Sequence, residues 1–120
     1  MMPKKGSRRL EVDGVCYRWR ESHGHHHFEL RLEWWHGRGQ MLVVLFPYRH
    51  LDAAAPWKVF RPIMTRRLLE GVVAFAQRLA WQPTLRRPPL GIGPEKSSTL
   101  VRDTDYRYSK DLVDKGGRYL

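Results

Sequence analysis

Histidine is the residue type in this chain with the clearest metal-ligand spacing. Four histidines stand between positions 23 and 27, at His23, His25, His26 and His27. His25 and His27 would point to one side of an extended strand, where two imidazoles and a third ligand could hold zinc or nickel. No cysteine pair or carboxylate completes a site locally. We therefore predict no functional metal and no other cofactor, with His25 and His27 as a weak metal candidate only.

Cys16 is the single cysteine and the one thiol that could act as a nucleophile. The sequence has neither a nucleophile elbow nor a glycine-rich phosphate loop to support it. Glu29 and Glu33 alternate with Arg31, and ion pairing across a sheet surface is the usual explanation of such acids. We therefore predict that the chain is not an enzyme and has no catalytic residue.

Arginine supplies the remaining candidate chemistry, because its planar guanidinium pairs with phosphate and stacks on bases. Arg18, Arg20 and Arg31 fall on one face of the predicted strands, with Trp35 as a candidate stacking ring. Further arginines lie on the predicted helix or after it. The predicted anion-binding residues are Arg18, Arg20, Arg31, Arg66, Arg67, Arg86 and Arg87.

The charge of the chain is strongly positive, at +10 over 120 residues. Residues 1–61 hold 11 basic and 6 acidic groups, residues 62–94 hold 5 and 1, and residues 95–120 hold 6 and 5. A positive field attracts phosphate backbones and acidic proteins alike. No helix-turn-helix, zinc-finger or aromatic RNA-binding signature decides between them. The prediction is a small basic binding domain, with nucleic acid or another polyanion ahead of acidic protein as the partner.

The apolar segments are too short to cross a bilayer. The longest run, from Met41 to Pro47, is seven residues, against roughly 20 for a transmembrane helix. Cys16 cannot form an intramolecular disulfide, and no secretion-type apolar stretch follows the N-terminus. We therefore predict a cytoplasmic protein that does not bind a membrane.

Alternation and turn residues predict the elements that position these side chains. Two alternating segments joined by Asp13-Gly14 predict a β-hairpin with strands over residues 8–13 and 15–21. A further alternating stretch predicts a strand over 27–35, and the apolar run predicts one over 40–48. Pro62 suits a first helical position, and apolar residues at helical spacing predict an amphipathic helix over 62–81.

Together these elements predict an α+β fold, a four-stranded antiparallel β-meander with one amphipathic helix packed on one face. Residues 1–7 are predicted to be a flexible leader and residues 8–94 a single domain. Residues 95–120 have a low apolar density, which predicts a polar, partly disordered tail.

The apolar run raises a question about the second face of the sheet. If Met41, Val43 and Leu45 face the helix, the residues between them lie on the other face, and something must cover them. The C-terminal segment, a second copy of the chain or a partner protein could do so. The alternative function is therefore a protein-interaction module, such as an accessory, inhibitor or antitoxin-like subunit. Its predicted interface residues are Leu42, Val44, Phe46 and Trp35.

The opening of the chain, RxLxVDGVxYRW over residues 8–19, resembles that of small uncharacterised proteins of high-GC bacteria. The predicted helix ending in Ala80-Trp81-x-Pro83 is similar to the way those proteins end. The resemblance covers residues 8–94 and implies no known activity. In those proteins a threonine often precedes the helix-starting proline, whereas here Arg61 does, so the expected N-cap is missing at that position.

Overall fold

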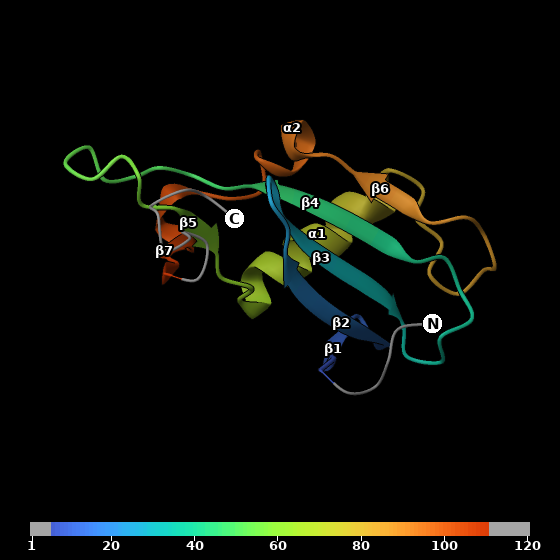
Figure 1. Ribbon diagram of the computed structural model, residues 1–120. Coiled ribbons are helices and arrows are strands. Elements are labelled where there is room, and N and C mark those ends of the chain that lie inside the picture. The colour runs from blue at the N-terminus through green and yellow to red at the C-terminus, as the bar shows by residue number, and fades with distance from the viewer. Residues whose placement is uncertain (1–5, 111–120) are drawn as a thin grey trace.

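The computed structural model describes residues 6–110 of the chain. Its main feature is a five-stranded sheet in the order β1-β2-β3-β4-β6 (Figure 1). The first four strands are antiparallel neighbours, and the last pairs with β4 in parallel. The strands of this sheet are β1 (Arg8–Val12), β2 (Val15–His23), β3 (His27–Trp34), β4 (Leu42–Pro47) and β6 (Leu90–Ile92). The predicted α+β class is confirmed, and β6 is an element that the sequence did not predict.

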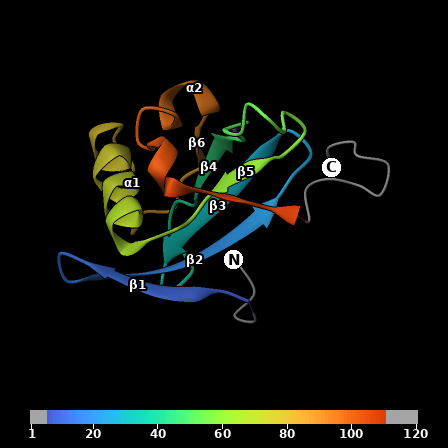
Figure 2. The same ribbon diagram turned by 90° about the vertical axis from the view of Figure 1, so that its left-hand side faces the viewer.

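One helix, α1 (Arg66–Arg78), lies along one face of this sheet (Figure 2). Within residues 6–110, no helix of similar length covers the opposite face. Its buried side chains recur at helical spacing and pack on the inward residues of the strands. The core formed in this way includes Tyr17, Phe28, Leu30, Val72 and Ala76.

The predicted start of the helix is wrong by four residues. Pro62 ends a short strand, β5 (Phe60–Pro62), which pairs with β7 (Tyr106–Tyr108). The helix begins after Thr65, whose hydroxyl oxygen accepts a hydrogen bond from the Leu68 amide at 3.2 Å. This side chain satisfies one of the amides that every helix leaves unpaired in its first turn. The N-cap threonine missing before Pro62 is therefore present three residues after that proline.

The predicted facing of β4 is also wrong. Val44 lies opposite Leu30 and Leu42 lies opposite Leu32, so these side chains share the inward face of the sheet with α1. Leu42, Val44 and Phe46 are fully buried in the core and cannot be interface residues. Alternate residues of a strand point to opposite faces, so the outward side chains of this segment are Met41, Val43 and Leu45.

Residues 94–110 are folded, although the sequence analysis placed most of them in a polar tail. They form α2 (Pro94–Ser97), a 3-10 turn at Asp103–Asp105, and β7. Ser97 is fully buried and donates a hydrogen bond to the Leu45 carbonyl at 2.5 Å, which fixes α2 at the edge of β4. The remainder of the predicted tail, residues 111–120, and residues 1–5 of the predicted leader lie outside the described residues.

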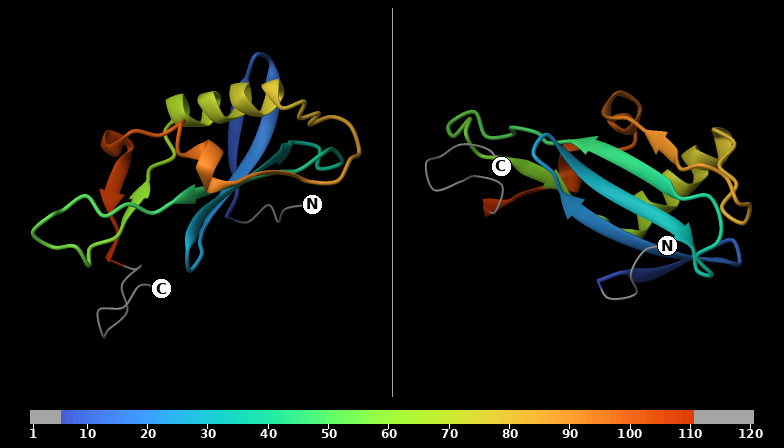
Figure 3. Two further views of the ribbon diagram at one scale, coloured as in Figure 1. Left: turned by 90° about the horizontal axis from the view of Figure 1, so that it is seen from above. Right: turned by 45° about the vertical axis from the view of Figure 1, so that its right-hand side comes forward.

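A second, two-stranded sheet of β5 and β7 lies at one end of the molecule. The loop between β4 and β5 projects beyond it, as two views show (Figures 1 and 3). We refer to residues 48–62 and 106–110 as the β5–β7 arm. Within residues 6–110, no helix has the length and apolar character needed to span a membrane.

Candidate anion-binding face

The sheet face opposite α1 carries most of the charged residues of the main sheet, and we call it the arginine face. Its side chains alternate with the core residues along β1 to β4. Arginines and glutamates predominate on the first three strands of this face, and the side chains that β4 contributes are apolar. The members are Arg9, Glu11, Cys16, Arg18, Arg20, Ser22, Glu29, Arg31, Glu33, Met41, Val43 and Leu45.

Two pairs of arginines stand directly opposite each other on neighbouring strands of this face. Arg9 of β1 lies opposite Arg18 of β2, and Arg20 of β2 lies opposite Arg31 of β3. Like charges at directly opposed positions destabilise a sheet. The register therefore places four arginines in a diagonal ladder, an arrangement that does not itself favour the folding of the sheet.

Arg18 is the most buried member of this ladder. Its side chain lies over Trp35, with 4.5 Å between the guanidinium carbon and the ring centroid, and the residue is only 3% exposed. Glu33, which is equally buried, stands opposite it on β3. Within residues 6–110, the Nη1 atom of Arg18 has no hydrogen-bond partner. Arg18 is therefore a buried charge that faces the acidic residue Glu33, and it is not an accessible contact.

The neighbours of Arg18 differ in how far their charge is compensated. Arg31 pairs with Glu29 at 2.8 Å, and Glu29 also accepts a hydrogen bond from Ser22. Arg9 lies 5.6 Å from the Trp35 ring centroid, and its Nε atom donates to the sulfur of Cys16 at 2.8 Å. Arg20 is exposed, and no ion pair within residues 6–110 involves it. Arg9 and Arg20 are thus the exposed members of the ladder without an ion pair within residues 6–110, whereas Arg31 is exposed but paired.

The other predicted arginines lie away from this face. Arg66 pairs with Glu70 at 2.7 Å and donates to the Glu11 carbonyl, while Arg67 pairs with Asp105. Both therefore hold parts of the fold together. Arg86 and Arg87 are exposed in the loop between α1 and β6. The structure therefore divides the predicted residues into three separate groups.

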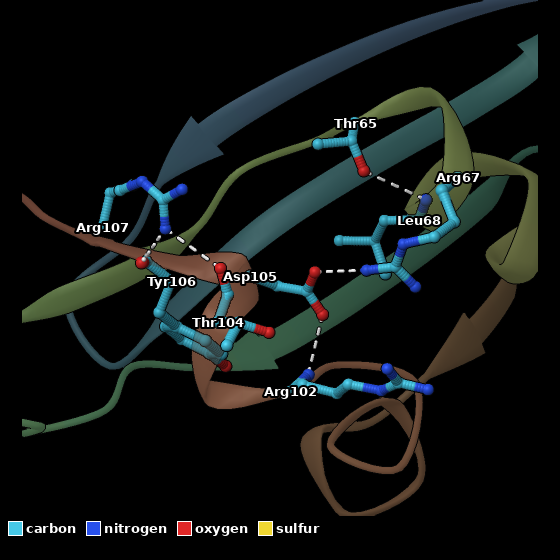
Figure 4. A network of polar contacts seen from close by, with 8 residues as sticks. All are labelled: Thr65, Arg67, Leu68, Arg102, Thr104, Asp105, Tyr106 and Arg107. Atoms are coloured by element: carbon cyan, nitrogen blue, oxygen red, sulfur yellow. Dashed lines mark hydrogen bonds and ion pairs between the residues drawn. The ribbon is translucent and has the colours of Figure 1, made fainter.

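The pairing of Arg67 with Asp105 belongs to a network that ties the start of α1 to the end of the described chain (Figure 4). Asp105 is buried and also accepts a hydrogen bond from the Arg102 amide at 2.8 Å. Burial alone would raise the pKa of the Asp105 carboxyl, but the Arg102 amide and the Arg67 guanidinium outweigh it and lower the pKa below 3.8. The Arg67–Asp105 pair is therefore structural, because each charge in it is compensated by the other.

Searches of protein families, curated proteins and solved structures find no match to this chain. The chemistry of the faces described above therefore carries the functional argument.

The histidine segment forms the turn between β2 and β3. Together with Ser22, Glu29 and Leu45 it lines a shallow hollow of about 380 Å³ at one end of the arginine face. Within residues 6–110, no three histidine, cysteine or acidic side chains are grouped so that they could hold a metal ion. His25 and His27 thus find no third ligand in the part of the chain that the structure describes.

Arg9 is the one ladder residue that the sequence analysis missed. The signal was present, because a two-residue turn at Asp13-Gly14 fixes the register of the hairpin. Both turn residues have positive φ, 51° and 78°, and Val12 lies opposite Val15. Counting outward from that pair places Arg9 opposite Arg18.

Proposed function

We propose that this chain is a small, non-enzymatic, cytoplasmic domain that binds an anionic partner through the arginine face, and that this partner is a nucleic acid. The observation that carries the proposal is the ladder of directly opposed arginines, Arg9 with Arg18 and Arg20 with Arg31. Like charges at opposed positions raise the free energy of the unliganded sheet. A polyanion that lies across the ladder removes this repulsion, because its phosphates sit between the guanidiniums.

The burial of Arg18 supports the same proposal. Burial and the Trp35 ring restrain its side chain, so its charge does not have to be ordered when a partner binds. Arg9 and Arg20, on either side of it, are exposed and can reach phosphate oxygens. The buried Arg18 and the two exposed arginines beside it suit a phosphate backbone. Such a backbone is bound through several repeated charge contacts and not through one defined contact.

A protein partner is the second candidate, and the outward residues of β4 favour it. Met41, Val43 and Leu45 are only partly buried and lie beside the arginines. Methionine, arginine and aromatic residues are enriched at protein interfaces. In this case an acidic protein would bury the apolar row and pair with the ladder, and most of its affinity would survive added salt.

Salt dependence tests the proposal. Labelled single-stranded and double-stranded DNA and RNA are titrated by fluorescence anisotropy at about 50 mM and about 200 mM salt, where phosphate binding falls steeply as counterions are released. We expect binding at the lower salt concentration that weakens at least tenfold at the higher one. No binding of any nucleic acid at the lower concentration would discard the proposal in favour of a protein partner.

A matched pair of variants locates the surface. Arg9→Gln/Arg20→Gln removes two exposed charges from the ladder, whereas Arg78→Gln/Lys96→Gln removes two exposed charges from α1 and α2. The ladder variant should bind weakly and lose about two from the slope of log affinity against log salt, one for each phosphate contact. The control should bind like the unmodified protein. Equal losses in both variants would mean that net charge, and not the arginine face, determines binding.

A further inference from the structure

The β5–β7 arm concentrates exposed aromatic surface. Trp57 in its loop is 52% exposed and Tyr108 on β7 is 43% exposed. Phe60 of β5 packs against Tyr108, with 5.9 Å between the ring centroids. The loop is nonetheless anchored, since Ala55 and Val59 are buried within it. Burial of a large ring stabilises a folded protein. Rings that an ordered segment nonetheless keeps exposed point to a binding site, where a partner would bury them.

Positive charge lies next to these rings. The Nζ atom of Lys58 lies 5.2 Å from the centroid of Tyr108 and also pairs with Asp52 at 3.4 Å. Arg107 of β7 is exposed and stands opposite Arg61 of β5, which repeats in the arm the like-charge pairing of the arginine face. The described hydrogen bonds of Arg107 go to backbone carbonyls, so its charge is not neutralised by them.

The arm lies at the end of the main sheet where the arginine ladder ends. Arg61 pairs with Glu21 at 3.4 Å, and Glu21 directly follows Arg20 on β2. Figure 3 shows β5 and β7 beyond that end of the sheet. Alternate residues of a strand point to opposite faces, so the Glu21–Arg61 pair lies on the α1 side of the sheet and Arg20 on the arginine face. A polyanion bound at Arg20 therefore reaches the cations and rings of the arm by passing around the end of β2.

Resting on the function proposed above, we infer that the partner is a single-stranded nucleic acid, whose unpaired bases stack on Trp57 and Tyr108. Exposed rings interleaved with lysine and arginine bind unpaired bases without regard to sequence. A duplex keeps its bases stacked on one another and offers only phosphates to such a surface. The arm thus selects single strands, and the ladder supplies charge attraction to both forms.

The test compares one labelled thymidine 20-mer with a duplex of the same length, by anisotropy at low salt. We expect the unmodified protein to bind the single strand at least tenfold more tightly. Trp57→Ala/Tyr108→Ala should remove that preference and leave duplex affinity unchanged. Trp57→Phe/Tyr108→Phe keeps both rings and should retain the preference. Leu85→Ala, which truncates an exposed apolar residue outside the arm, should bind like the unmodified protein.

The outcomes separate this inference from the function on which it rests. If both nucleic acids bind equally and the alanine variant changes neither, while Arg9→Gln/Arg20→Gln weakens both, the inference is wrong and the proposed function stands. If neither nucleic acid binds at low salt, both are wrong. If the alanine variant loses binding to vesicles of phosphatidylserine and phosphatidylcholine but keeps its single-strand preference, the arm contacts lipid and the inference is overturned.

Discussion

The guanidinium of Arg18 lies over the ring of Trp35, at 4.5 Å from its centroid, while the carboxylate of Glu33 occupies the opposite position on β3. Loss of Arg18 would therefore remove the cation that lies over Trp35 and the positive charge opposite Glu33. We expect Arg18→Met to destabilise the protein by about 3 kcal/mol or more, because Glu33 stays buried without the opposite charge. Urea unfolding at neutral pH measures the change.

A second substitution separates charge from packing at this position. Arg18→Met/Glu33→Leu replaces both buried charges by apolar groups and should recover most of the lost stability, since such replacements are often close to neutral. A double variant as unstable as the single one would show that the guanidinium stabilises the sheet through Trp35 alone.

Gly39 is required by a close approach of two loops. A Cβ atom at this position would lie 1.5 Å from the carbonyl oxygen of Pro83, so the backbone of one loop would have to move. We expect Gly39→Ala to cost about 3 kcal/mol or more in the free energy of unfolding. Gly91→Ala is the matched control, because nothing lies within 4 Å of the added carbon. Similar thermal unfolding of the two variants would contradict the contact.

The lowered pKa of the Asp105 carboxyl predicts an acid-dependent loss of stability. A carboxyl whose pKa is lower in the folded state than in the unfolded state stabilises the fold at neutral pH. This contribution is complete above the unfolded value near 3.8 and disappears as the pH falls through the folded value. Asp105→Asn should thus be less stable than the unmodified protein at pH 7, with a difference that narrows toward acid pH.

Chemical unfolding at a series of pH values checks this prediction. Asp103→Asn is the control, since its side chain is 72% exposed although it also pairs with an arginine, Arg49. The control should follow the unmodified protein closely, because exposed pairs contribute about 0–1 kcal/mol. A constant difference between Asp105→Asn and the unmodified protein at all pH values would rule out the role of this charge.

Tyr106 predicts a loss of stability at alkaline pH. Burial, more than any neighbouring charge, raises the pKa of its hydroxyl to about 12, and that hydroxyl donates to the Pro47 carbonyl at 2.6 Å. Because the folded value lies above the unfolded value near 10, the contribution is complete below pH 10 and is lost as the pH rises toward 12. Tyr106→Phe should be about 1 kcal/mol less stable at pH 7.

Above pH 10 the same substitution should narrow or reverse that difference, because phenylalanine has no proton to lose. Thermal unfolding at neutral and alkaline pH measures it. Tyr108→Phe, at an exposed position of the same strand, should follow the unmodified protein throughout. If Tyr106→Phe loses as much stability with rising pH as the unmodified protein, the buried hydroxyl does not control the alkaline transition.

Local chemistry made the first half of the fold predictable. The Asp13-Gly14 turn and the alternation around it specify a hairpin, and β1 and β2 form on either side of that turn. The segment that became β4 carries apolar residues at every position, so no alternation shows which of them face inward. Pairing with β3 decides this, and the turn between the two strands contains no short signal that sets the register.

The second half depends on contacts between distant segments, which the sequence does not display. Pro62 and Thr65 both resemble helix starts, and β7 decides between them by pairing with residues 60–62. Strand β6 is three residues long and lies in a segment rich in proline and glycine. The candidate site is likewise only partly predictable. The position of Arg9 can be derived from the hairpin turn, whereas the exposed rings of the arm are placed by the pairing of β5 with β7, which the sequence does not reveal.

The parallel pairing of β4 with β6 also has a consequence for the order of synthesis. The four-stranded meander can form as soon as Pro47 has left the ribosome, but the outer edge of β4 stays unpaired until residues 90–97 emerge and supply β6 and α2. During that interval the most apolar strand of the chain presents open hydrogen-bonding groups, and a nascent neighbour on the same message could pair with it. Translation speed through residues 48–90 therefore limits how long each new chain is exposed to that misassembly.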